Sequence, residues 1–150
     1  MEYYKSASLQ SQFRGYDYFK NDKVVSFKQI DNSIYHGKVK GNNQVYDVTI
    51  DVLHPKKNSR CNCPHAEGTK IICKHMVALF FAIFPLKAKQ FMDEIDKHNR
   101  EVEEYEHELD MKMRKYIKSM SKKELEEALL ECLYQVDWLY DNFIRDRVGY

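Results

Sequence analysis

Three cysteines and a histidine stand in two close pairs near the middle of the chain. One residue separates Cys61 from Cys63, one separates Cys73 from His75, and nine residues lie between the pairs. Zinc prefers four nitrogen and sulfur ligands in a tetrahedron, and two close pairs joined by a loop supply them with little ordering of the backbone. Because four protein ligands leave no coordination position for water, the spacing predicts one structural Zn²⁺ ion rather than a catalytic one.

The residues around the two pairs suit a metal site. Gly68 favours a turn in the intervening loop, and Cys73 stands where an apolar segment begins, so the N-terminus of a helix there would favour its thiolate. Three thiolates and a neutral imidazole give a Zn²⁺ site a net charge of −1. The nearby Arg60, Lys70 and Lys74 are placed to offset part of it.

Two further residues are alternative ligands. His65 lies two residues after Cys63 and could replace His75 as the fourth ligand. Cys132 stands far from the cluster at a core position of a helical pattern, so a buried thiol is the favoured interpretation and a fifth ligand or a nucleophile the alternative.

The elements that must position this cluster are three strands and a helix. The segments 23–30, 34–39 and 45–53 are rich in Val, Ile and aromatic residues and are separated by turn residues. The third segment alternates apolar and polar residues, which is typical of a strand with one buried face. We therefore expect a three-stranded antiparallel β-meander, preceded by a short helical or irregular lead and covered by the apolar stretch 71–84.

The residues after Pro85 form two helical patterns. Apolar residues recur at steps of three and four between Phe91 and Tyr116, and again between Leu125 and Phe143. Ser121 and Glu124 match a capping box at the start of the second pattern. These patterns predict an antiparallel helical hairpin, with packing inside the chain favoured over a dimerising coiled coil or a docking surface for another protein.

The charge of the chain differs between its two halves. Residues 1–85 hold twelve Lys and Arg against seven Asp and Glu, a net charge of +5, while residues 86–150 hold twelve against sixteen, a net charge of −4. The overall charge of +1 is the sum of these opposite halves. We therefore predict two parts, a zinc-finger domain over 1–85 and a helical, coiled-coil-like extension over 86–150, within an α+β fold.

No segment of the chain has the pattern of a secretion signal or a membrane span. The N-terminus lacks a basic region followed by an apolar run, and the most apolar run, 76–84, is nine residues long, against about 20 for a membrane span. An intracellular, reducing and cytoplasmic location is expected, in which a tight Cys and His cluster points to metal binding rather than to disulfides.

The Cys-x-Cys and Cys-x-His pairs resemble the signature of the SWIM zinc-finger family. The similarity includes Arg14-Gly-Tyr-Asp-Tyr-Phe19, Val24–Phe27 and the strand at 45–52, which look like the helix and meander ahead of the metal pair in bacterial members, and Cys73-Lys-His-Met-Val-Ala-Leu79 after it. It covers about residues 13–85. The resemblance implies a ββα-like fold, zinc bound by Cys61, Cys63, Cys73 and His75, and a role in DNA binding or protein interaction.

These patterns predict a binding module and not an enzyme. No catalytic triad order, phosphate-cradling glycine loop or paired catalytic carboxylates stand out, so neither a catalytic residue nor a small-molecule substrate is expected. One hypothesis is a protein-interaction adaptor, with a protein partner or self-association through the hairpin. The alternative is DNA or other nucleic-acid binding by basic residues around the zinc loop, namely Lys56, Lys57, Arg60, Lys70 and Lys74.

Overall fold

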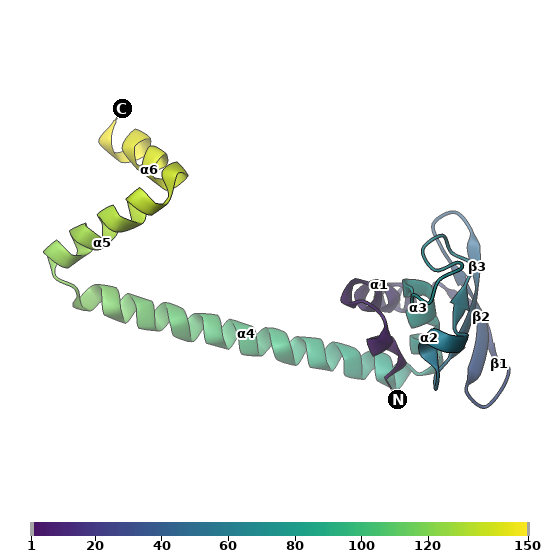
Figure 1. Cartoon of the computed structure of the whole chain (residues 1–150). Helices are drawn as coiled ribbons and strands as arrows, with labels where there is room; N and C mark the ends of the chain where they lie inside the picture. The colour runs from purple at the N-terminus through teal and green to yellow at the C-terminus, as the bar shows by residue number, and fades with distance from the viewer. Residues whose placement is uncertain (1, 150) are drawn as a thin grey trace. The chain divides into compact units, whose positions relative to one another are not determined.

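A computed structural model describes residues 2–149 and divides the chain into two units after Asp96. The division falls inside a long helix, eleven residues beyond the predicted boundary at residue 85. Each unit is described by itself below (Figure 1).

The first unit contains one antiparallel sheet of four strands in the order β1-β2-β3-β4. The strands are β1 (Val24–Gln29), β2 (Ile34–Lys40), β3 (Val45–Asp51) and β4 (Arg60–Cys61). The first three confirm the predicted meander, but the prediction of three strands was wrong by one. A two-residue strand is too short to show an alternating pattern, so β4 left no periodic signal in the sequence.

Helices lie in layers on one side of this sheet. The helix α3 (Lys74–Ile83) contacts all four strands, and α1 (Leu9–Lys20) packs against α3 (Figure 1). The two helices approach closely at Gly15, where an added Cβ atom would lie 2.5 Å from Val77. Two short elements complete the unit, the 3₁₀ turn η1 (Tyr3–Ser6) and α2 (Pro55–Asn58).

The core lies between the sheet and these helices. Val48 and Ile50 from β3 and nearly every side chain of α3 are buried. The aromatic rings of Tyr4, Phe81 and Phe91 lie within 5.6 Å of one another, measured between ring centroids. Phe91 reaches this cluster from α4 (Pro85–Ser119), whose first residue, proline, is well suited to a helix start.

The second unit is helical. It contains the remainder of α4, then α5 (Lys122–Gln135), α6 (Asp137–Phe143) and a π-helical turn, η2 (Ile144–Val148). The predicted capping box is confirmed, since the Ser121 hydroxyl accepts from the Glu124 amide while the Glu124 carboxylate accepts from the Ser121 amide. The predicted single helix to Phe143 was wrong, because Val136 adopts an extended conformation and separates α5 from α6.

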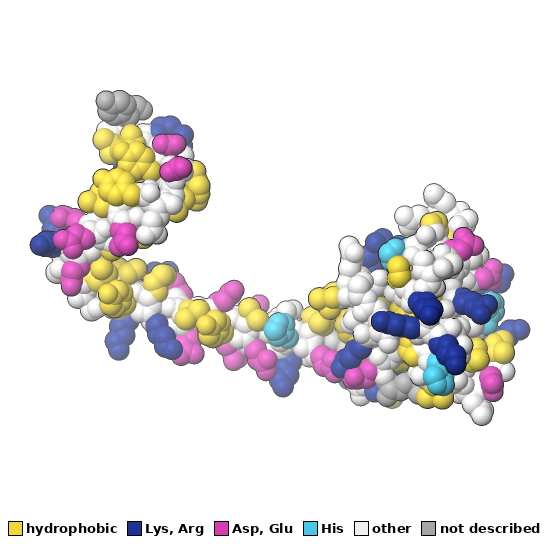
Figure 2. Space-filling view, viewed as in Figure 1, with side chains coloured by type: hydrophobic (Ala, Val, Ile, Leu, Met, Phe, Trp, Pro, Cys, Tyr) yellow, Lys and Arg dark blue, Asp and Glu magenta, His cyan; other side chains and the backbone are white. Residues whose placement is uncertain are grey.

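The expected helical hairpin is not formed. Between residues 97 and 149, α4 and α5 do not pack along their lengths, and their apolar stripes stay exposed. Figure 2 shows these hydrophobic side chains gathered along the helices. No helix among the described residues combines the length and apolar character of a membrane span.

Candidate metal centre

The four predicted metal ligands come together in the first unit. The ligand atoms of Cys61, Cys63, Cys73 and His75 all lie within 4.8 Å of one another, and the four side chains are buried. The Nδ1 atom of His75 is 3.7 Å from the Cys61 sulfur and 3.9 Å from the Cys73 sulfur. Zinc bonded to sulfur and nitrogen at its usual distances separates the two ligand atoms by roughly 3.5 Å, so the cluster has the size that the ion requires.

Three different elements present these ligands. Cys61 lies on β4, paired with Val48 of the central strand β3. Cys73 is the N-terminal cap of α3, and His75 stands in the first turn of that helix. Cys63 begins a turn in which its carbonyl accepts hydrogen bonds from the amides of Ala66 and Glu67. The backbone of its own element therefore positions each ligand.

The loop between the two pairs is held by its own hydrogen bonds. The hydroxyl of Thr69 donates to the carbonyl of Ala66 and accepts from the amide of Ile71. Gly68 has a φ of +72°, a left-handed conformation that glycine adopts without strain, which confirms the predicted turn. The loop thus returns the chain to the start of α3 without contributing a ligand.

The thiols differ in their acidity. A hydrogen bond from Cys61 lowers the pKa of Cys73 to about 4 against the opposing effect of burial, with further help from His75 and the Met76 amide. The same hydrogen bond raises the pKa of Cys61, and burial raises that of Cys63. Cys73 is therefore the most acidic of the three thiols, as expected for a cysteine at a helix N-terminus.

Two tyrosines hold the imidazole of His75. The ring centroid of Tyr46 is 4.5 Å from that of His75, and the centroid of Tyr18 is 5.3 Å away on an edge contact. Because Nδ1 faces the sulfurs, metal binding through it places the proton on Nε2. The Nε2 atom is buried without a hydrogen-bond partner among residues 2–149. The sequence prediction missed both tyrosines, since only the fold brings them to the ligand.

The donor set and its burial fit a structural zinc ion. Three sulfurs and one imidazole nitrogen are the ligands of structural zinc sites, and all four coordination positions are filled by the protein. His65, the alternative fourth ligand, is exposed in the loop and lies outside the cluster. Cys132 is exposed on α5, so the prediction of a buried thiol was wrong: without a hairpin, the neighbouring Leu133 is the buried residue.

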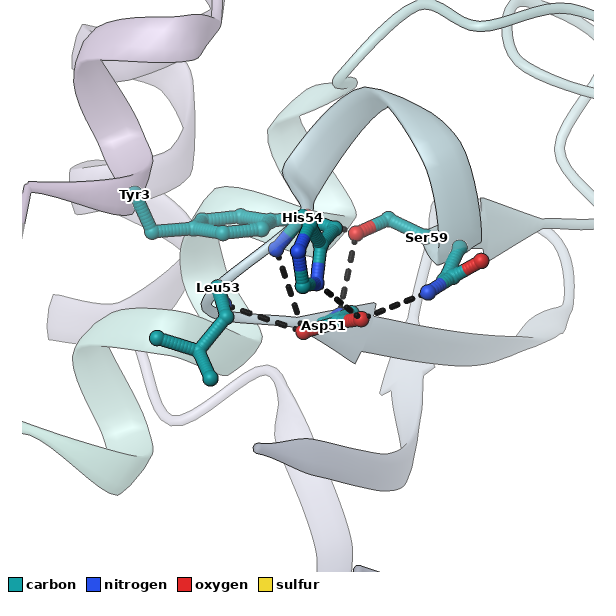
Figure 3. Close-up of polar contacts among 6 residues, drawn as sticks. Tyr3, Asp51, Leu53, His54 and Ser59 are labelled. Carbon is teal, nitrogen blue, oxygen red and sulfur yellow. Dashed lines mark hydrogen bonds and ion pairs between the residues drawn. The ribbon is translucent and has the colours of Figure 1, made fainter. Parts of the chain in front are cut away.

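A polar network braces the chain just before the first ligand (Figure 3). Asp51, at the end of β3, is 2% exposed, and its carboxylate accepts from the amides of Leu53 and His54 and from the Asn58 side chain. These hydrogen bonds overcome the effect of burial and lower the pKa of Asp51 to about 2. An aspartate followed by a turn is a sequence signal for such a network, but the alternation of apolar and polar residues in this segment predicts only a strand.

Ser59 connects this network to the N-terminus. Its hydroxyl accepts from the Asp51 amide at 3.1 Å and from the Tyr3 hydroxyl at 2.9 Å. Tyr3 stacks on Phe80 with centroids 5.3 Å apart and is 1% exposed. Tyr4 is also buried, so neither ring is available to stack on a nucleic-acid base.

The predicted nucleic-acid contacts are spread over the surface around the zinc loop. Lys56 and Lys70 line one hollow, of about 510 Å³, and Arg60 and Lys70 line another, of about 520 Å³. Lys74 lies elsewhere, with its ammonium group 4.5 Å from the centre of the Tyr18 ring. Lys57 is exposed on α2. Lys70 therefore lies beside both Lys56 and Arg60, whereas Lys74 lines neither of these hollows.

Comparison with known proteins gives one match. Residues 46–84 match the family model described as SWIM zinc finger. Comparisons with curated proteins and with solved structures give no match. The matched segment runs from the second residue of β3 to the C-terminal cap of α3 and contains all four clustered ligands. Residues 46–84 of this chain are therefore a zinc-binding module of the SWIM zinc-finger type.

Proposed function

We propose that the chain is a non-enzymatic protein-interaction adaptor, in which one structural zinc ion makes the first unit rigid and the second unit binds a protein partner. The closed and buried ligand set supports a structural metal, because it offers no position to a reacting molecule. The first unit packs most of its aromatic rings into or against its own core, with Phe13 and Phe27 exposed. The second unit buries far fewer apolar side chains and therefore offers the surface for a partner.

The observation that carries this proposal is the exposure of large apolar side chains between residues 97 and 149. Fourteen of them are exposed, and Leu133 is the one apolar residue in this range that is buried. A helical segment with so little core of its own gains stability mainly by packing against something else. Tyr134 and Trp138, 69% and 66% exposed, are the aromatic side chains that interfaces favour.

Photo-crosslinking in living cells tests the adaptor role. A benzophenone amino acid replacing Trp138 should give a covalent adduct heavier than the chain, while the same group at Lys28, an exposed position on β1, should give none. An adduct of twice the mass of the chain would identify a second copy. Adducts of equal yield at both positions, or none at either, would contradict the adaptor proposal.

Nucleic-acid binding is the second candidate function, and two adjoining hollows beside the metal centre favour it. One, of about 350 Å³, includes Arg14 and His65, and the other, of about 410 Å³, includes the amide side chains of Asn42 and Asn43. Both are lined by a tyrosine, a lysine and the metal-binding histidine, namely Tyr46, Lys74 and His75. Cations beside an aromatic ring and amides suit a single-stranded nucleic acid.

Fluorescence anisotropy with a labelled single-stranded oligonucleotide tests this second function. Binding should weaken steeply as salt rises, and Arg14→Gln should weaken it several-fold more than Lys57→Gln, a matched charge loss away from these hollows. Equal effects of the two substitutions, or binding that does not depend on salt, would exclude these hollows as the site.

A further inference from the structure

An exposed apolar stripe runs along the part of α4 that belongs to the second unit. Its members are exposed by between 40% and 68%: Val102, Tyr105, Leu109, Met113 and Tyr116. At about 100° of rotation per residue, all five lie within an arc of roughly 80° on the helix surface. A stripe this narrow is the seam of a two-helix contact, not the broad face of a helix packed on a large core.

The stripe has nearly the same spacing when it is followed in either direction about position 111. Leu109 and Met113 lie two residues from it, Tyr105 six residues before it and Tyr116 five after it, and Val102 and Met120 nine residues from it, with Met120 just beyond the end of the helix. Two copies of α4 laid antiparallel therefore bring an apolar residue opposite an apolar residue in every layer. This self-complementarity is what a two-fold symmetric contact requires.

In the same antiparallel arrangement, the charged residues beside the stripe have opposite signs in the two copies. Residues 101–110 contain six Asp and Glu and no Lys or Arg, and residues 112–118 contain four Lys and Arg and no Asp or Glu. Helix geometry puts Glu108 on one flank, beside Lys112 and Lys115 of an antiparallel copy. Within its own helix Glu108 already pairs with Lys112 at 2.6 Å, so Lys115 is the new partner that the copy supplies.

We propose that the occupant of this stripe is α4 of a second copy of the chain, so that the protein is an antiparallel two-fold dimer. The inference goes beyond the adaptor role, because self-association through α4 requires no other partner. The aromatic positions of α5 and α6 remain available to another protein.

Two other possible partners for the stripe are a parallel copy of α4 and the α5 helix of the same chain, and each would bring like charges together. In a parallel pair, Glu101 of one copy faces Glu106 of the other along the seam. If α5 folds back on α4, the acidic part of α4 meets Glu131 and Asp137 and Lys118 meets Lys123, while Glu126 meets Lys115. The antiparallel pair places Glu108 beside Lys115 of the other copy and brings no like charges together on that flank, so electrostatic complementarity favours it.

Sedimentation equilibrium of the zinc-loaded full chain tests the dimer. The expected mass approaches twice 18.0 kDa as concentration rises through the micromolar range. Leu109→Lys should raise the dimer Kd by more than about tenfold. Glu108→Lys should also weaken the dimer, whereas Glu104→Lys, the same charge change on the far side of the helix, should leave the Kd within about twofold. A mass of 18.0 kDa throughout would overturn the proposal.

Disulfide trapping distinguishes the orientation, with Cys132→Ser as the background. A mixture of Val102→Cys and Met120→Cys chains carrying different tags should yield the mixed dimer in a glutathione buffer, while Val102→Cys alone should yield little. Trapping by Val102→Cys alone would mean a parallel pair and would overturn the antiparallel arrangement. Dimerisation that persists in Leu109→Lys would place the contact elsewhere and would overturn the assignment of α4.

Discussion

The two units of this chain bury their apolar residues to very different extents. The first unit packs some twenty side chains into one core around α3, with rings from η1, α1 and α4 meeting there. Between residues 97 and 149, one apolar residue is buried and fourteen large ones are exposed. Helices in both units carry periodic apolar residues. A periodic apolar pattern therefore specifies a helix, but it does not specify which surface packs against the apolar face of that helix.

This contrast predicts that stability in the first unit comes from its metal and its core, while the second unit depends on helix-local contacts and on association. Each substitution below is therefore compared with a matched control substitution.

Loss of the metal should have the largest effect. Structural zinc contributes on the order of 10 to 16 kcal/mol in small fingers, comparable to the whole stability of a domain. Chelation or Cys63→Ser should therefore release one zinc ion and unfold the sheet, while α5 keeps most of its helix. Metal analysis and amide exchange measure both results, with Cys132→Ser as the matched cysteine control. Sheet amides that stay protected in metal-free protein would refute the prediction.

Truncation of a core ring should have the next largest effect. Phe81 is 0% exposed and contacts rings on three sides, so Phe81→Ala should lower the free energy of unfolding of the first unit by about 3 to 5 kcal/mol. Tyr134→Ala on the exposed surface of α5 should cost less than about 0.5 kcal/mol in dilute solution. Urea denaturation followed by near-ultraviolet circular dichroism gives both values. Similar losses of unfolding free energy at the two positions would contradict the difference in core packing between the two units.

Substitution of Asp51 should have an intermediate effect. Its pKa is lowered from 3.8 to about 2, so the carboxylate contributes roughly 2 kcal/mol, present above pH 4 and lost as pH falls towards 2. Asp51→Asn should cost about that amount at neutral pH, and the difference from wild type should disappear as pH falls towards 2. Glu104→Gln on α4 is the matched control. A difference that stays the same from pH 7 down to pH 2 would show that another group carries the effect.

Removal of the α5 cap should have the smallest effect. Ser121→Ala removes the acceptor for the Glu124 amide and should cost about 1 kcal/mol, measured as faster amide exchange in the first turn of α5. The first unit should keep its exchange rates. The control is Ser119→Ala, which removes a hydroxyl that donates to the Tyr116 carbonyl at the end of α4. Equal changes of amide exchange in the two variants would show that the effect does not come from the cap.

Much of the metal centre could be predicted from the sequence, because ligand type and spacing are local properties. The pairs Cys61 with Cys63 and Cys73 with His75 pointed to a closed zinc site, and the structure brings all four together. The prediction of His75 rather than His65 as the fourth ligand depended on a helix that begins at Cys73. The apolar run after Cys73 indicated that helix.

The surroundings of that centre could not be predicted in the same way. Tyr18 and Tyr46 come from a helix and a strand distant in sequence, and only packing puts them against His75. Tyr3 stands at the start of the chain in no apolar pattern, and only the fold shows that its ring is buried in the core. Burial depends on the sum of neighbours from several elements, which a pattern along one segment does not contain.

The sequence by itself determined the four ligands, the three longer strands, the start of the long helix at Pro85 and the cap at Ser121, since each follows from a short-range pattern. The tertiary structure alone decided that Arg60 and Cys61 form a fourth strand, that α4 and α5 stay apart, and that Cys132 is exposed. The physical reason is that short-range patterns fix backbone conformation, whereas pairing and burial depend on which distant surfaces complement each other in shape and charge.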